Sequence, residues 1–208
     1  SLVGSEMCIR DSPDFMLKEI HEQPRAVKDT LNSVLKDGKI DLTDIGLAEE
    51  DIRRTSQIYI VACGSAYHVG MVAQYVIEDL VKIPVRVELA SEFRYRKPIL
   101  DPNGLVIIIS QSGETADSLA ALRETKAQGI RTLGIVNVVG SSIAREADKV
   151  FYTLAGPEIS VATTKAYSTQ LMASYILAIQ FAKVKNTITE EQLSLIHISE
   201  PTRLLSIS

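Results

Sequence analysis

The sequence is poor in the residues that build metal sites and disulfide frameworks. Its 208 residues include only two cysteines and three histidines. Cys8 and Cys63 are far apart and form no CxxC pair, so neither a zinc site nor a disulfide framework is indicated, and a reducing cytoplasm is the expected location. We expect no metal and no other cofactor.

The chain also lacks an excess of basic residues and an uninterrupted apolar run. Its formal net charge is -4, which gives no electrostatic reason to expect nucleic acid as a partner. The longest apolar-rich segment, 161–184, contains Lys165 and is interrupted by Gln170, Ser174 and Gln180, so we do not expect it to span a membrane. The expected partner is a small molecule or another protein.

Both ends of the chain differ from its middle. Residues 1–12 and 194–208 resemble translated sequencing adapters, and we expect both segments to be artefacts that contribute nothing to the fold. Residues 1–12 also lack the basic start and the long apolar core of a signal peptide. The rest is expected to be a fragment of a longer protein, with a linker and lead-in helices at 13–55 and one domain at 56–193.

Strand-like and helix-like segments alternate along this domain. The expected strands are apolar and bounded by turn residues, at 57–62, 85–89, 105–109, 132–136 and 150–154. The expected helices lie between them, at 65–82, 114–127 and 141–147, with a long one beginning near Val161 and an amphipathic lead-in helix at 14–38 interrupted by Pro24. Strands that are apolar at nearly every residue are typical of a parallel sheet covered by helices. The pattern predicts an α/β fold, a doubly wound parallel sheet of about five strands flanked by helices.

A polar loop at 110–115 follows the third expected strand and precedes a helix. It supplies three hydroxyls and an amide, from Ser110, Gln111, Ser112 and Thr115. The amino end of a helix presents free N–H groups and a partial positive charge, so such a loop favours a bound anion, most often phosphate. The alternative is that Ser110 or Ser112 merely caps the helix, with Glu114 in its first turn.

A second turn, Cys63-Gly64-Ser65, repeats the order of strand, glycine turn, hydroxyl and helix. Since the carboxyl ends of parallel strands meet at one edge of a sheet, the two turns are expected to hold one sugar phosphate between them. For Cys63 we favour a small buried side chain over a nucleophile, because the sequence places no partner histidine beside it. His68 is expected to be packed or exposed rather than a proton shuttle.

Two further polar segments allow more than one interpretation. In the loop 158–165, Thr163, Thr164 and Lys165 could reach a ligand or a subunit contact, but Ser160 as a helix cap and Lys165 as a solvated charge fit equally well. Residues 92–97 mix acidic, basic and aromatic side chains, and we expect a solvated or interface segment there.

Four sequence strings together resemble one enzyme family, the isomerizing glutamine–fructose-6-phosphate aminotransferases. They are CGSAYH at 63–68, ASEFRYR at 90–96, SQSGETAD at 110–117 and EISVATTK at 158–165, and they match in order and spacing. The resemblance extends over residues 15–192 and implies the first of two sugar isomerase (SIS) domains, with a flavodoxin-like fold. One departure is visible, because the family usually has Gly-Thr-Ser where this chain has Gly64-Ser65-Ala66.

The resemblance also implies which residues bind fructose 6-phosphate. The phosphate would be held by Ser110, Gln111, Ser112 and Thr115, and the sugar by the first turn and the later loop, through Cys63, Gly64, Ser65, Val161, Ala162 and Thr163. The family converts fructose 6-phosphate and glutamine to glucosamine 6-phosphate and glutamate in amino-sugar biosynthesis. No catalytic residue is expected in this chain, because the glutaminase domain and the second SIS domain would supply them. A homodimer is also implied.

Two other functions are compatible with the same fold. A sugar-phosphate sensor of a transcription regulator would need a basic helix-turn-helix segment, and nothing at 13–55 resembles one. A standalone sugar-phosphate isomerase would need its own acid and base beside the loop.

Overall fold

The computed structural model describes residues 14–189, 191 and 192, so the expectations for residues 1–12 and 194–208 lie outside the described part. Five parallel strands form the central sheet, in the order β4-β3-β5-β6-β7. Their bounds are β3 Ile58–Ala62, β4 Val85–Leu89, β5 Leu105–Ser110, β6 Arg131–Val136 and β7 Lys149–Tyr152. The predicted α/β fold with a doubly wound parallel sheet is confirmed.

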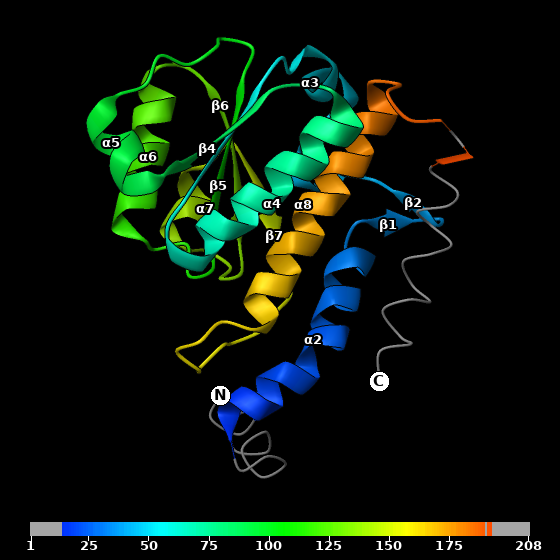
Figure 1. Ribbon diagram of the computed structural model, residues 1–208, viewed down its shortest axis with the longest axis vertical. Coiled ribbons are helices and arrows are strands. Elements are labelled where there is room, and N and C mark those ends of the chain that lie inside the picture. The colour runs from blue at the N-terminus through cyan, green and yellow to red at the C-terminus, as the bar shows by residue number, and fades with distance from the viewer. Residues whose placement is uncertain (1–13, 190, 193–208) are drawn as a thin grey trace.

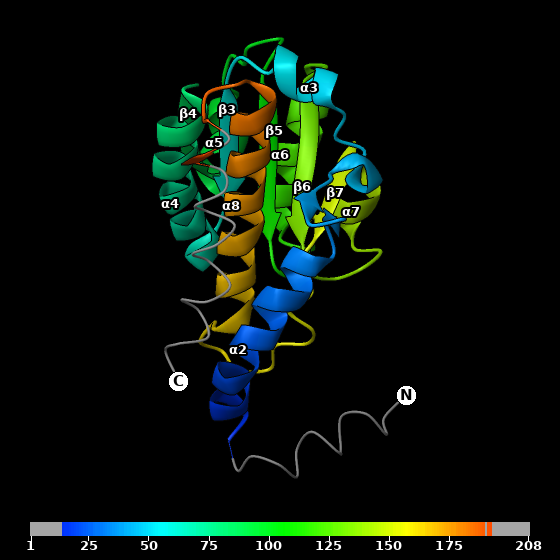
Figure 2. The same ribbon diagram turned by 90° about the vertical axis from the view of Figure 1, so that its right-hand side faces the viewer.

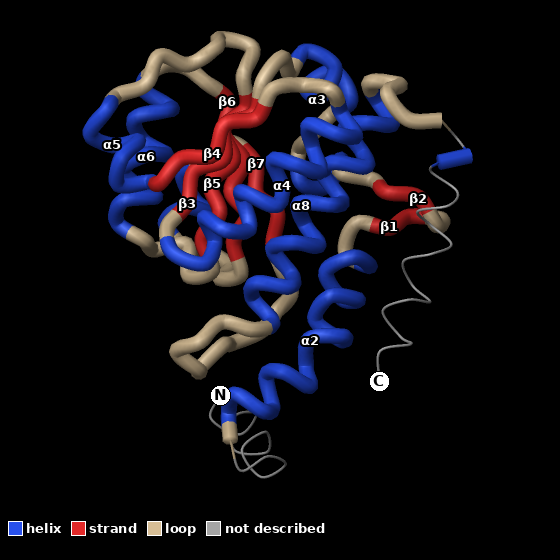
Figure 3. The backbone as a smooth tube through the Cα atoms, in the orientation of Figure 1, coloured by secondary structure: helices blue, strands red, loops and turns tan. Residues whose placement is uncertain are grey.

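Helices cover both faces of this sheet (Figures 1 and 3). One face carries α4 Gly64–Val81 and α8 Lys165–Val184, and the other carries α5 Ala90–Arg96, α6 Ala116–Ala127 and α7 Ser142–Glu146. Alternate side chains of β3 enter the two cores, with Ile58 and Ile60 on the α4 side and Tyr59 and Val61 on the α6 side. Every residue of β3 and β5 is buried, as the apolar strands predict.

The lead-in segment contains more elements than the expected helix at 14–38. Its elements are α2 Phe15–Asn32, β1 Leu35–Lys36, β2 Lys39–Ile40, the 3-10 helix η1 Thr43–Ile45 and α3 Glu49–Arg54. Helix α2 continues through Pro24 but ends at Asn32. The prediction of a helix as far as residue 38 is wrong, because Asp37 and Gly38 both adopt positive φ and turn the chain into the β1–β2 hairpin.

Residues 92–97 were expected to be a solvated or interface segment, and most of them are exposed, on helix α5 and its C-cap Lys97. Phe93 is fully buried in the core beneath this helix, whereas Tyr95 is exposed. Among the described helices, none is both long enough and apolar enough to cross a membrane.

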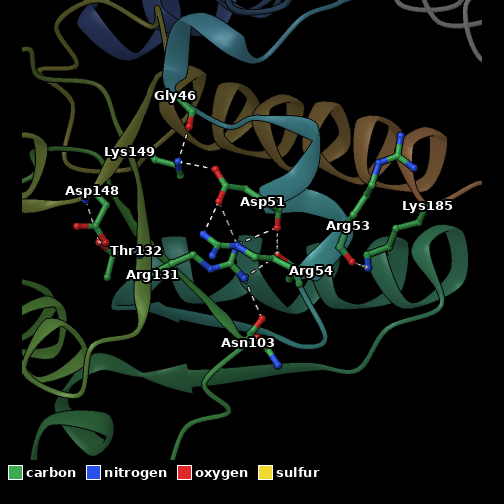
Figure 4. A network of polar contacts seen from close by, with 11 residues as sticks. Gly46, Asp51, Arg53, Arg54, Asn103, Arg131, Thr132, Asp148, Lys149 and Lys185 are labelled. Atoms are coloured by element: carbon green, nitrogen blue, oxygen red, sulfur yellow. Dashed lines mark hydrogen bonds and ion pairs between the residues drawn. The ribbon is translucent and has the colours of Figure 1, made fainter.

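A polar network joins the lead-in segment to the amino ends of β6 and β7 (Figure 4). The carboxylate of Asp51 in α3 accepts hydrogen bonds from Lys149 at 2.8 Å and from Arg54 at 2.5 Å. The guanidinium of Arg131 donates to the backbone carbonyls of Asp51 at 2.8 Å and of Asn103 at 2.9 Å. These links fasten α3 to the edge of the sheet opposite the carboxyl ends of the strands.

Candidate functional site

A pocket of about 210 Å³ lies at the carboxyl ends of β3 and β5. The chain leaves β3 for β4 on one side and later returns to β5 on the other, so the pocket lies at the point where the strand order reverses. Its walls come from the turn after β3, the loop after β5, and the segment around the start of α8. The lining residues are Cys63, Ser65, Ala66, Ile109, Ser110, Gln111, Ser112, Thr115, Thr163 and Gln170.

Most of the residues predicted for the site are brought together in this pocket, but three are not among its lining. Gly64 shapes the turn after β3 with a φ of 56°. Val161 has a fully exposed side chain, and Ala162 beside it is also exposed. In this conformation, Val161 and Ala162 therefore do not face the described pocket.

The loop after β5 is held by its own hydroxyls. The Ser110 side chain, 3% exposed, accepts a hydrogen bond from the Gly113 amide at 3.1 Å. Its Oγ also lies 3.0 Å from Oγ1 of Thr115, and Oγ of Ser112 accepts from the Glu114 amide at 3.2 Å. These internal hydrogen bonds hold the loop in one shape, and its three hydroxyl-bearing residues all line the pocket.

The helix-cap interpretation of Ser110 and Ser112 is wrong. The N-cap residue of α6 is Thr115, and its side chain makes no capping hydrogen bond. Cys63, the N-cap of α4, likewise makes none. The amino ends of two helices therefore meet the pocket without a side-chain cap, which is the arrangement that stabilises a bound anion through backbone N–H groups.

No charged side chain is found among the described residues that line the pocket. The one carboxylate of the loop, Glu114, instead accepts a hydrogen bond from the Ser142 amide at 2.7 Å. Hydrogen bonding with Ser142 lowers the pKa of Glu114, so the side chain is held ionised at the start of α7. Anion binding in the pocket would depend on hydroxyls, the Gln111 amide and backbone N–H groups.

Asn137 links two loops of the site and was not predicted from the sequence. Its amide donates to the carbonyl of Gln111 at 3.1 Å, and its side chain donates to the Gly156 carbonyl at 2.7 Å and accepts from the Ala155 amide at 3.0 Å. Its position in the sequence could have indicated this role, because Asn137 directly follows β6, just as the serine-rich loop follows β5.

The segment before α8 is organised by Glu158. Its carboxylate accepts hydrogen bonds from the hydroxyl of Thr163 at 3.0 Å and from the amides of Thr164 at 2.8 Å and Ala166 at 3.2 Å. The Glu158 carboxylate thus lies against the amino end of α8, where a negative charge is favourable. Thr163, which Glu158 binds, also lines the pocket.

The alternatives for Ser160 and Lys165 are both corrected by the structure. The N-cap residue of α8 is Thr164 rather than Ser160. The Lys165 side chain is only 5% exposed and donates to Glu22 of α2 at 2.6 Å, so it is neither a solvated charge nor part of the pocket lining. Sequence reasoning could not find this pair, because its members are 143 residues apart.

The remaining polar groups add little chemistry. Cys63 is half-buried, with its Sγ 3.9 Å from Oγ of Ser118, and His68 is exposed beside Tyr67. Gln170, which sequence reasoning treated only as an interruption of the apolar run, is buried and lines the pocket. Within the described ranges, no three His, Cys, Asp or Glu side chains are grouped so that they could hold a metal ion.

Comparisons with known proteins agree with this geometry. The SIS domain family matches residues 51–180. The glutamine–fructose-6-phosphate aminotransferase of Clostridium tetani is 59% identical over 180 residues, which cover 86% of this chain and 30% of that protein. The enzyme of Clostridium acetobutylicum is 58% identical over the same shares of the two chains.

A solved structure extends the likeness to three dimensions. The C-terminal domain of glucosamine-fructose-6-phosphate aminotransferase from Francisella tularensis matches with a TM-score of 0.89 and 44% identity, over 94% of this chain and 55% of that one. The chain spans about 30% of the length of the curated relatives it matches. It belongs to the SIS domain family and is homologous to the glutamine–fructose-6-phosphate aminotransferases.

Proposed function

We propose that this chain is the sugar-phosphate-binding part of a glutamine–fructose-6-phosphate aminotransferase and that its pocket holds fructose 6-phosphate. The observation that carries the proposal is the serine-rich loop at 110–115, which meets the pocket together with the uncapped start of α6. The identity of 59% to the Clostridium tetani enzyme supports fructose 6-phosphate as the ligand.

In this proposal, the phosphate is bound by the loop after β5. Ser112 and Thr115 donate hydroxyl hydrogen bonds, Gln111 donates from its amide, and Ser110 holds the loop in shape while presenting its own hydroxyl. Phosphate in such a site is stabilised by neutral donors and by the positive end of α6 rather than by a cation.

The sugar is proposed to lie between the turn after β3 and the start of α8. Ser65 and Thr163 offer hydroxyls, and Cys63 and Gly64 shape the turn. Val161 and Ala162 remain proposed ligand contacts on the strength of the family resemblance alone.

The whole reaction is proposed to need parts that this chain does not supply. Glutamine hydrolysis would occur in a glutaminase domain, and proton transfer on the sugar would use residues of a second SIS domain. This chain would hold the substrate. The whole enzyme would be a cytoplasmic homodimer. Among the described lining residues there is no Asp, Glu, His or Lys to act as a general base. A standalone isomerase is therefore not favoured.

Calorimetric titration of the 208-residue chain with fructose 6-phosphate tests the proposal. We expect saturable binding that is weaker for inorganic phosphate and weakest for fructose. Ser112→Ala should lower the affinity about tenfold, because a hydrogen bond to a charged group is lost. Ser56→Ala is the matched control, since that hydroxyl binds Asp101 away from the pocket lining and should leave affinity unchanged. A folded chain that does not bind at millimolar ligand would overturn the proposal.

A further inference from the structure

Helix α2 lies outside the residues that match the SIS domain family, yet it packs along α8 (Figures 1 and 2). Helix α8 carries Gln170 to the pocket, and the segment before it carries Thr163. An element that holds α8 and this segment in place therefore controls one wall of the pocket, without touching the ligand itself.

Three polar side chains of α2 make these links. Glu19 accepts hydrogen bonds from the backbone amides of Ile159 at 2.6 Å and Ser160 at 3.2 Å. Glu22 pairs with Lys165 at 2.6 Å, and Gln23 accepts from the hydroxyl of Ser168 at 2.5 Å. Residues 19, 22 and 23 are spaced so that they share one face of the helix, and this face follows the chain from the loop into the first turn of α8.

Two of the groups in these links are buried, which favours a single register of α2 against α8. Glu19 is 3% exposed, and the Lys165 side chain is 5% exposed. A charge taken out of water is costly unless it meets its partner, so any sliding of α2 along α8 would leave these groups unpaired. An apolar contact of the same area would tolerate such sliding far better.

The segment held by α2 is closed into a rigid unit by Glu158. Because the Glu158 carboxylate binds both Thr163 and the first turn of α8, the position of the loop and the position of α8 are coupled. A displacement of Lys165 or of the Ile159 amide is therefore expected to displace Thr163 as well.

We infer that Glu19, Glu22 and Gln23 of α2 are positioning residues for the sugar side of the pocket, which they set by fixing the segment 158–168. This inference rests on the proposed function for its ligand. Among the described hydrogen bonds, none joins Glu19, Glu22 or Gln23 to the serine-rich loop, so we expect these three residues to affect the sugar side more than the phosphate side. Glu19, Glu22 and Gln23 would thus tune affinity for the sugar more strongly than affinity for phosphate.

The test compares Glu22→Gln with Arg25→Gln, which removes an 87% exposed charge from the same helix. We expect Glu22→Gln to lower fructose 6-phosphate affinity about tenfold and to leave inorganic phosphate affinity within about twofold, because the buried Lys165 loses the negative charge of its partner. Arg25→Gln should change neither affinity. A purely structural role would weaken both ligands together.

Gln23→Ala serves if Glu22→Gln does not fold. It removes the link to Ser168 and an exposed hydrogen bond to the Ile20 carbonyl within α2, and is expected to lower sugar affinity about threefold. Amide hydrogen exchange gives a readout without ligand, and residues 159–168 should exchange faster in Glu22→Gln than in Arg25→Gln. Unchanged exchange and unchanged fructose 6-phosphate affinity in folded variants would overturn the inference. If the unsubstituted chain does not bind fructose 6-phosphate, the proposed function fails, and the exchange data alone decide whether α2 fixes this segment.

Discussion

Gly113 lies so close to Ser141 that a Cβ on residue 113 would stand 2.0 Å from the Ser141 hydroxyl and 2.6 Å from its Cβ. Ser141 is 2% exposed and belongs to the turn before α7. The amide of Ile143 donates to the carbonyl of Gly113 at 3.0 Å. The serine-rich loop is therefore packed directly onto the start of α7, and its shape depends on the missing side chain at 113.

Gly113→Ala should destabilise the chain by about 3 kcal/mol, because the new methyl group adds overpacking to the cost of a positive φ. Gly129→Ala is the matched control, since Gly129 has a φ of 72° but no atom within 4 Å of its Cβ position. That control should lose only about 1 kcal/mol. Urea denaturation measures both, and equal losses would mean that the contact with Ser141 carries no strain.

Ser110→Ala should weaken fructose 6-phosphate binding about tenfold and cost about 1 kcal/mol of stability, because the Gly113 amide loses its acceptor. Thr125→Val is a suitable control. Thr125 is also buried, and its hydroxyl donates to the Ala121 carbonyl at 2.8 Å away from the pocket lining. Titration calorimetry and denaturation should show similar stability losses but a loss of affinity for Ser110→Ala alone. Equal affinities in the two variants would contradict a role for Ser110 in the site.

The sheet was predictable because each strand carries its own signal. Strand β4 occupies the predicted residues 85–89, and the other strands differ from prediction only at their ends. The residues that line the pocket from β3 and β5 were also predictable, since hydroxyls directly after a buried strand must gather at one edge of a parallel sheet.

The contacts between α2 and α8 could not be predicted in the same way. The Glu22–Lys165 pair joins residues 143 positions apart, and neither side chain differs in local pattern from a solvated charge. The early end of α2 was missed for a different reason. The apolar spacing of Val34 and Leu35 continues the helical pattern, while the positive φ of Asp37 and Gly38 overrides it.

Asp51 should make stability depend on pH at the acidic end. Burial raises the pKa of this carboxyl, but hydrogen bonds from Lys149 and Arg54 outweigh it and hold the pKa below its usual range. A carboxylate with a lowered pKa in the folded state stabilises above the unfolded pKa of about 4, and this contribution is lost as the pH falls through the folded value.

Asp51→Asn should therefore cost about 2 kcal/mol near pH 7, and the difference from the unsubstituted chain should shrink towards about pH 3. Asp79→Asn is the control, because Asp79 forms an exposed pair with Lys82 at 3.4 Å and should lose less than about 0.5 kcal/mol. Urea denaturation across this pH range measures both variants. A loss for Asp51→Asn that is the same at every pH would show that its charge does not matter.

Ala66 gives a prediction in the opposite direction, towards tighter binding. It is 8% exposed, lines the pocket in the first turn of α4, and stands where the enzymes that this chain resembles usually have serine. Ala66→Ser should raise fructose 6-phosphate affinity about fivefold, because a hydroxyl donor is added beside the bound sugar phosphate. Ala127→Ser, at the exposed end of α6, adds the same hydroxyl outside the pocket and should leave affinity unchanged. Titration calorimetry measures the affinity of both variants. If Ala66→Ser keeps its stability but does not bind fructose 6-phosphate more tightly than the unsubstituted chain, the ligand does not approach the start of α4.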